Sequence, residues 1–198
     1  MGGKKIRGLT IALALLLTAC VPSKKPLIVG SKNFTEQVVL GELIAQHLEH
    51  RLGRPVQRQL NLGGTLLTYQ ALLNGQISLY PEYTGTIEAE ILRETPTADA
   101  AQVYERSRLE MERRSQLDLL PSLGFDNTFV MVISGEAARK NQIATLSEAA
   151  QAKQGWKLGM GYEFSQRIDG EPALNTYHLP MAAAPRSMDM GLDRKSVV

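Results

Sequence analysis

The chain has 198 residues, of which 43% are hydrophobic and 21% are charged, with a formal net charge of +2 and a single cysteine. This composition is ordinary for a globular protein, and it excludes long disordered segments, collagen-like repeats and a framework of disulfide bonds. The weakly basic balance gives no reason to expect a nucleic-acid partner.

The chain begins with the pattern of an export signal. A basic segment over 4–7 precedes an apolar run over 9–17, which is too short to span a bilayer as a helix. The run leads through small residues to Cys20, and this arrangement resembles the lipobox of bacterial lipoproteins. By that resemblance, 1–19 is a signal peptide and Cys20 is the lipid attachment site, so the protein is anchored to a bacterial membrane and faces the periplasm or the cell exterior. The alternative is a buried free thiol beside a chance apolar run.

The folded part is expected to begin with a strand, a loop and a helix. Residues 20–26 form the lipid anchor and a polar, proline-bounded linker. The apolar run over 27–30 then predicts a strand, and the spacing of apolar residues predicts a helix that continues to Leu52. Asn33 and Glu36 have the spacing of a capping box at the start of this helix.

The same order of elements then repeats. A second strand is predicted over 56–62. After the Gly63-Gly64 turn, Thr65 is expected to cap a helix through Leu72 that stops at Asn74-Gly75. A third apolar run follows over 77–80. Strands that alternate with helices predict a parallel sheet with right-handed crossovers.

Three loops are expected to converge at one edge of this sheet, because ligands of such sheets collect at the carboxyl ends of the strands. These loops are 31–36, 62–65 and 80–86. Two of them open helices, whose unpaired backbone N–H groups favour an anionic group such as a carboxylate. Lys32 supplies a cation to the same place, or is simply solvated.

The third loop, 80–86, is the most informative part of the sequence. It places two phenols, a carboxylate and two hydroxyls within a short stretch at a strand end. A plain turn would need only its proline and its glycine. The loop therefore predicts a binding site.

The later elements are also predicted from their patterns. Residues 97–114 are expected to form a helix with Asp99 as its cap, and their alternating arginines and glutamates are typical of a solvated face rather than of a phosphate-binding patch. The apolar run over 128–133 predicts a buried strand. A helix near 146–153 and a strand near 156–160 follow.

The motifs at 29–37, 63–65 and 80–86, in this order and spacing, resemble those of the substrate-binding lipoproteins of osmoprotectant ABC transporters. The resemblance runs from about Leu27 to Leu192. It implies an α/β fold of the two-lobe periplasmic-binding-protein (Venus-flytrap) type, with parallel-type sheets. The first lobe would be 27–126 and an incomplete second lobe 127–192.

The resemblance also implies the ligand and its contacts. Members of this family take up glycine betaine, choline, carnitine and similar compounds. A quaternary ammonium has no N–H to donate and is held by aromatic faces, each worth roughly 0.5 to 2 kcal/mol. By motif position Tyr83 is a cage residue with Thr86 beside it. Asn127 and Phe129 are assigned to the same site, and the phenylalanine stands where the family usually has tyrosine.

Arg167 matches the arginine that in the family faces the ligand carboxylate across the cleft. Spacing alone leaves an alternative open, in which Arg167 is a surface residue paired with Asp169 or Glu163. Tyr162 and Tyr177 are expected to pack inside the second lobe. Trp156 is expected to belong to the core of the second lobe.

The carboxyl end departs from the family pattern. The last six residues, 193–198, can be encoded by a sequence that resembles a common sequencing adapter with an in-frame stop codon, so we expect a non-native tail there. Without 1–19 and 193–198 the formal net charge changes from +2 to −2.

The leading hypothesis is an extracytoplasmic receptor that has no catalytic residue and no cofactor, with an ABC permease and ATPase as partners. A second hypothesis is a dehydratase-like periplasmic enzyme with Glu82 and Glu163 as general acid or base. A third is a lipoprotein without a transport role on the same fold. The three histidines lack a completing cluster, and no metal site is expected.

Overall fold

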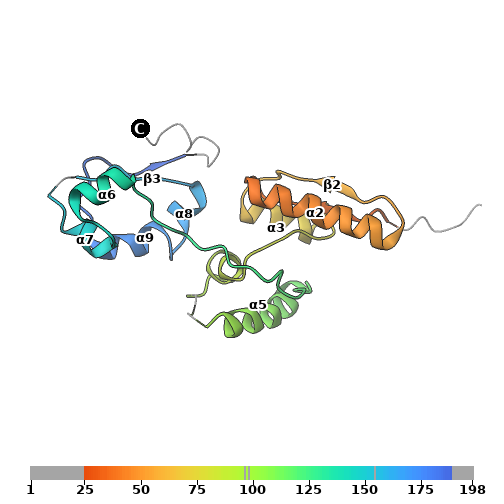
Figure 1. Ribbon diagram of the computed structural model, residues 1–198. Helices are drawn as coiled ribbons and strands as arrows, with labels where there is room; N and C mark the ends of the chain where they lie inside the picture. Colours follow the sequence, from red (N-terminus) through yellow and green to blue (C-terminus); the bar gives the residue numbers. More distant parts are fainter. Residues whose placement is uncertain (1–24, 96, 98, 154, 189–198) are drawn as a thin grey trace, which may run out of the picture.

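The computed structural model describes residues 25–188 except 96, 98 and 154. An N-terminal unit (25–116) and a C-terminal unit (135–188) lie at the two ends of an extended connecting segment, 117–134 (Figure 1). The N-terminal unit contains β1 (Ile28–Gly30), α2 (Thr35–Leu52), β2 (Gln57–Gln59), α3 (Thr65–Leu73), α4 (Thr84–Thr86), the π-helix η1 (Ile87–Leu92) and α5 (Ala100–Ser115). The C-terminal unit contains α6 (Gly135–Asn141), α7 (Leu146–Ala150), β3 (Gly159–Met160), α8 (Tyr162–Gln166), α9 (Glu171–Leu174), the 3₁₀ helix η2 (Asn175–Tyr177) and β4 (Arg186–Ser187).

The sheet of the N-terminal unit is parallel, as predicted. β1 pairs with β2 in parallel, with Val29 opposite Arg58. On its other side Val29 forms a parallel bridge with Leu79, so the third apolar run lies where a third strand was expected. The buried residues Val29, Ala45 and Val56 form the core between this sheet and α2.

Helix α2 ends as the sequence predicts but begins differently. Gly53 follows its last turn with φ of 62°, a left-handed conformation that favours glycine, and its N–H donates to the carbonyl of Glu49. At the other end no side chain caps the helix, so the capping box predicted from Asn33 and Glu36 is wrong. The Glu36 carboxylate instead accepts a hydrogen bond from the hydroxyl of Tyr83, a partner that local spacing could not indicate.

Helix α5 confirms the predicted cap and the solvated charged face. The Asp99 carboxylate accepts hydrogen bonds from the N–H groups of the next turn. Ion pairs join Arg108 to Glu105 and Arg113 to Glu110, whose side chains are all at least partly exposed. On its inner side, α5 packs Met111 against a second buried cluster with Ile87 and Leu92 of η1.

The C-terminal unit contains a second small parallel sheet. β3 pairs with β4, and Trp156 forms a parallel bridge with Met181. Trp156 is half-buried, and its indole N–H donates to the carbonyl of Ala149 over 2.8 Å. Tyr162 and Tyr177 are exposed by 59% and 43%, so the expectation that they pack inside this unit is wrong.

The connecting segment differs most from its prediction. Residues 128–133 do not form a strand, and Val130 and Val132 are exposed by 71% and 76%. The apolar sequence predicts burial, but burial needs a neighbouring element, and no described strand pairs with this segment. In the described part of the chain, no helix combines the length and the apolar character that crossing a membrane would need.

Candidate functional site

The three predicted loops meet at the carboxyl edge of the N-terminal sheet. The backbone N–H of Asn33, in the first loop, donates to the carbonyl of Gly63 in the second loop over 3.0 Å. The ammonium of Lys32 then joins the first loop to the third, because it donates to Glu82. We call this edge, together with the residues of the C-terminal unit and of the connecting segment that contact it, the junction.

Lys32 lies beneath the junction as a buried cation. Its side chain is fully buried, and Nζ lies 2.6 Å from Glu82 Oε1 and 3.3 Å from the hydroxyl oxygen of Thr65. The same ammonium lies 5.0 Å from the ring centroid of Tyr83 and 5.6 Å from that of Phe34. Its charge is therefore already balanced by Glu82 and by two aromatic faces.

Glu82 is the buried carboxylate of this pair. Its Oε1 also accepts a hydrogen bond of 2.9 Å from the N–H of Tyr83. Its Oε2 is buried and has no hydrogen-bond partner among the described residues. Burial raises the pKa of the Glu82 carboxyl above its ordinary value, and the Lys32 ammonium acts in the opposite direction.

Tyr83 and Asn127, both predicted site residues, meet at one carboxylate. The hydroxyl of Tyr83 donates to Glu36 Oε1 over 2.6 Å, and Asn127 Nδ2 donates to the same oxygen over 3.0 Å. The ring of Tyr83 stacks on Phe34 with a centroid distance of 6.2 Å. Glu36 thus links the third loop to the connecting segment.

The Tyr83 phenol gives a prediction for an alkaline titration. Burial, together with the hydrogen bond to Glu36, raises the pKa of Tyr83 to about 12. The resulting contribution to stability is complete below the ordinary phenol pKa near 10 and is lost as the pH rises past 12. The absorbance difference between wild type and Tyr83→Phe, followed through alkaline pH, should therefore show a step near pH 12. A step near pH 10 would contradict the contact with Glu36.

Phe129 lies in the connecting segment and is half exposed. Its ring packs edge to face against Phe164 of α8, with centroids 5.0 Å apart. The guanidinium carbon of Arg167 lies 5.0 Å from the Phe129 centroid. One face of this ring is thus occupied by a cation of the protein itself.

Arg167 follows α8 and is buried, with only 5% of its side chain exposed. It donates to both carboxylate oxygens of Asp169, from Nε over 2.8 Å and from a terminal nitrogen over 2.6 Å. Another nitrogen donates to the hydroxyl of Thr86 over 2.6 Å. The pairing with Asp169 that spacing allowed is present, but the residue lies at the junction and not on the surface.

Glu163 is among the junction residues that the site prediction lacked. Glu163 Oε1 accepts hydrogen bonds from the backbone N–H and the hydroxyl of Thr65, at 3.0 and 3.1 Å. Glu163 belongs to α8, and Thr65 is the first residue of α3, so the two helices face each other here (Figure 1). The sequence named Glu163 only as a possible acid, base or ion-pair partner, because contacts between residues so far apart leave no local signal.

Acidic groups outnumber basic groups at the junction. Lys32 and Arg167 are the cations, and the carboxylates are Glu36, Glu82, Glu90, Glu163 and Asp169. Glu90 lies 3.6 Å from Arg167. Burial, and to a smaller extent the charge of Glu163, raises the pKa of the Glu90 carboxyl. Within the described residues no group of His, Cys, Asp and Glu side chains is placed to hold a metal ion.

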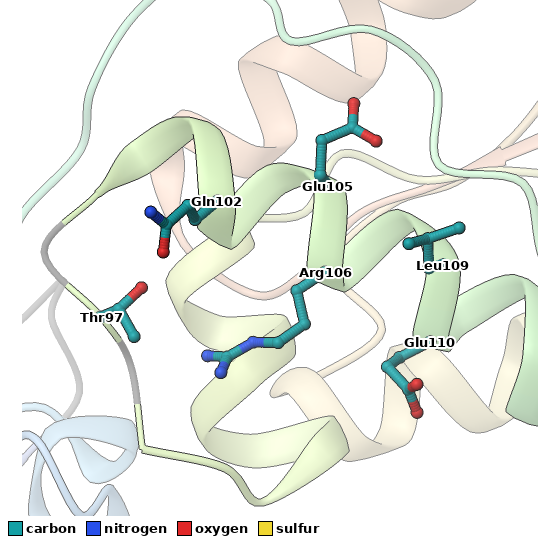
Figure 2. A pocket seen from close by; sticks show the side chains of 6 residues that line it. All are labelled: Thr97, Gln102, Glu105, Arg106, Leu109 and Glu110. Carbon is teal, nitrogen blue, oxygen red and sulfur yellow. The ribbon is translucent and has the colours of Figure 1, made fainter.

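A separate hollow of about 360 Å³ lies along α5 (Figure 2). It is lined by Thr97, Gln102, Glu105, Arg106, Leu109 and Glu110. Its charged groups already have partners in the protein, since Arg106 pairs with the buried Glu88 and Glu110 pairs with arginines of α5. None of the predicted site residues lines this hollow, so the junction remains the candidate site.

The remaining sequence predictions concern the two ends of the chain. The predicted signal peptide, the lipid attachment site at Cys20 and the predicted tail over 193–198 lie outside the described residues.

Comparison with known proteins places the chain among solute-binding proteins. Residues 25–195 match the family described as OpuAC, the substrate-binding domain of the ABC-type glycine betaine transport system. The chain is 33% identical over 175 residues to the ergothioneine transport permease/ergothioneine binding protein EgtU of Helicobacter pylori (strain G27), covering 87% of this chain and 31% of the relative. It is also 33% identical over 168 residues to the glycine betaine-binding protein YehZ of Escherichia coli (strain K12), covering 82% of this chain and 53% of YehZ.

A solved structure agrees with this placement. The structure of apo YehZ from Escherichia coli matches with a TM-score of 0.55 and 29% sequence identity, over 85% of this chain and 62% of that one. The chain thus spans between about a third and about half of the length of the two curated relatives.

Two α/β units with parallel sheets, which meet at a junction of aromatic and charged side chains, define the class of two-lobe substrate-binding proteins. Within that class the family match covers most of the chain. The protein belongs to the OpuAC family of substrate-binding domains of glycine betaine ABC transport systems.

Proposed function

We propose that this protein binds a quaternary-ammonium osmoprotectant outside the cytoplasm and delivers it to the permease and ATPase of an ABC transporter. The observation that supports this most is the junction, where aromatic rings and carboxylates from both units and from the connecting segment come together. The family match and the glycine betaine bound by the relative YehZ support the ligand class.

The chemistry of the junction suits such a ligand. A quaternary ammonium cannot donate a hydrogen bond, so it is held by aromatic faces and by negative charge. Two cations of the protein already lie against aromatic rings of the junction. Lys32 Nζ lies 5.0 Å from the ring centroid of Tyr83, and the guanidinium carbon of Arg167 lies 5.0 Å from that of Phe129. The rings are therefore placed in surroundings that attract cations.

The proposal includes no chemical reaction. A dehydratase-like enzyme would need a general acid or base that is free to act on a substrate. Glu82 is paired with Lys32, and Glu163 accepts two hydrogen bonds from Thr65. These contacts leave neither carboxylate free to act as a general acid or base, which favours a binding protein.

Export and anchoring form the other part of the proposal. In it, residues 1–19 direct export and are removed, and Cys20 carries the lipid that tethers the protein to the membrane. This part rests on the sequence pattern of the basic segment, the apolar run and the cysteine. A tethered receptor remains beside the permease that it serves.

The ligand role of Tyr83 can be tested by calorimetry with glycine betaine, choline and carnitine. Tyr83→Ala removes one aromatic face and should weaken binding by about tenfold. Tyr177→Ala is the matched control, because Tyr177 is 43% exposed and belongs to η2 in the C-terminal unit. Its effect should stay below about twofold. Equal effects of the two substitutions would contradict the site, and release of a converted product would contradict the binding role.

A further inference from the structure

The binding position for a carboxylate at the junction is already filled by the protein. The first turn of α3 presents the N–H and the hydroxyl of Thr65, and such a helix start is where the sequence predicts a ligand carboxylate. Glu163 Oε1 occupies this position at 3.0 and 3.1 Å. A carboxylate of the C-terminal unit therefore occupies the position that the sequence predicts for a ligand carboxylate.

The cations that could bind a second carboxylate are also taken. Lys32 is fully buried and 2.6 Å from Glu82. Arg167 forms two hydrogen bonds with Asp169 and is 5% exposed. Both hydrogen bonds that Glu163 accepts come from the uncharged groups of Thr65. Its negative charge therefore remains uncompensated by a direct ion pair in the described residues.

Three atoms near the junction are buried without a hydrogen-bond partner among the described residues: two acceptors, Glu82 Oε2 and Glu90 Oε1, and one donor, Gln37 Nε2. Glu82 Oε2 is buried without a hydrogen-bond partner among the described residues, and the Glu82 side chain is only 6% exposed. A buried acceptor of this kind favours a ligand that brings a donor, such as a hydroxyl. A ligand carboxylate brings only further acceptors and a like charge, which is unfavourable beside Glu163.

We propose that Glu163 is a specificity-determining residue, which makes the site select a quaternary-ammonium alcohol over a quaternary-ammonium carboxylate. This inference rests on the proposed function, because it concerns the ligand of the same site. Choline represents the first class and glycine betaine the second. The two ligands share the trimethylammonium group, so their ratio of affinities reports on the other end of the molecule.

The test is calorimetric titration of choline and glycine betaine into the wild-type chain, Glu163→Gln and Glu136→Gln. Wild type should bind choline at least about tenfold more tightly than glycine betaine. Glu163→Gln keeps the shape but removes the charge, and it should reduce this ratio by about tenfold, mainly through tighter binding of glycine betaine. Glu136, exposed in α6, is the matched control, and its substitution should leave the ratio unchanged.

Two results would overturn the inference while leaving the proposed function intact. The first is that the wild-type protein binds glycine betaine as tightly as choline, which can be measured without any variant. The other is a ratio that Glu163→Gln does not change. Failure of the proposed function has a different signature, since neither ligand then binds to any of the three proteins, and the inference is overturned with it.

Discussion

Lys32→Met should destabilise the protein by about 3 to 5 kcal/mol, because it leaves the Glu82 carboxylate buried without its counter-charge. The pair is 2.6 Å apart, with side chains 0% and 6% exposed, so water cannot replace the missing ammonium. The substitution also removes the donor to Thr65. Urea unfolding, followed by circular dichroism, measures the change in the free energy of unfolding.

The effect of Lys32→Met should depend on pH. Without the ammonium, burial and the charge of Glu163 raise the pKa of Glu82 in the folded protein, and the N–H of Tyr83 opposes them. A raised pKa gives stability that is present below the ordinary value of 4.5 and is lost as the pH rises through the folded value, so the deficit should shrink in mild acid. Lys140→Met, at an exposed position of α6, is the control and should cost less than about 0.5 kcal/mol. A deficit that grows in acid would contradict the ion pair.

Arg167→Met should cost about 2 to 4 kcal/mol and loosen the junction of the two units. The guanidinium connects Asp169 of the C-terminal unit to Thr86 and to the carbonyl of Gly85 in the N-terminal unit. Methionine fills a similar volume but provides none of these donors. Urea unfolding measures the cost, and small-angle X-ray scattering should show a larger radius of gyration.

Arg139→Met provides the comparison for this substitution. Arg139 is exposed in α6 of the same unit. Its substitution should change the free energy of unfolding by less than about 0.5 kcal/mol and should leave the scattering curve unchanged. If Arg167→Met lowered stability without changing the radius of gyration, the guanidinium would stabilise its own unit without holding the junction together.

The sequence predicts the N-terminal sheet and its loops well, because their signals are local. The apolar runs before Gly30 and near Leu79 and the helical spacing down to Leu52 lead directly to parallel strands with helices between them. Parallel pairing then brings the loop ends together, and the contact between Lys32 and Glu82 confirms it. Asp99 was found as a cap for the same reason, since its partners lie within the next turn.

The other features depend on partners that are distant in the sequence. Glu36 has the spacing of a capping residue, but its carboxylate accepts a hydrogen bond from the distant hydroxyl of Tyr83 instead. Glu163 reaches Thr65 across 98 positions, and no periodicity records such a contact. Tyr162 and Tyr177 are exposed although their size suggested packing, because only a few apolar residues of the C-terminal unit are buried.

The uncovered connecting segment has a consequence for how this chain behaves in solution. Residues 129–133 present apolar side chains that are between 41% and 76% exposed, and no backbone hydrogen bond joins them to another part of the described chain. An extended apolar backbone with free donors and acceptors is a template for strand pairing. Measurements of affinity and stability should therefore be repeated over a range of protein concentrations, because self-association through this segment would make both depend on concentration.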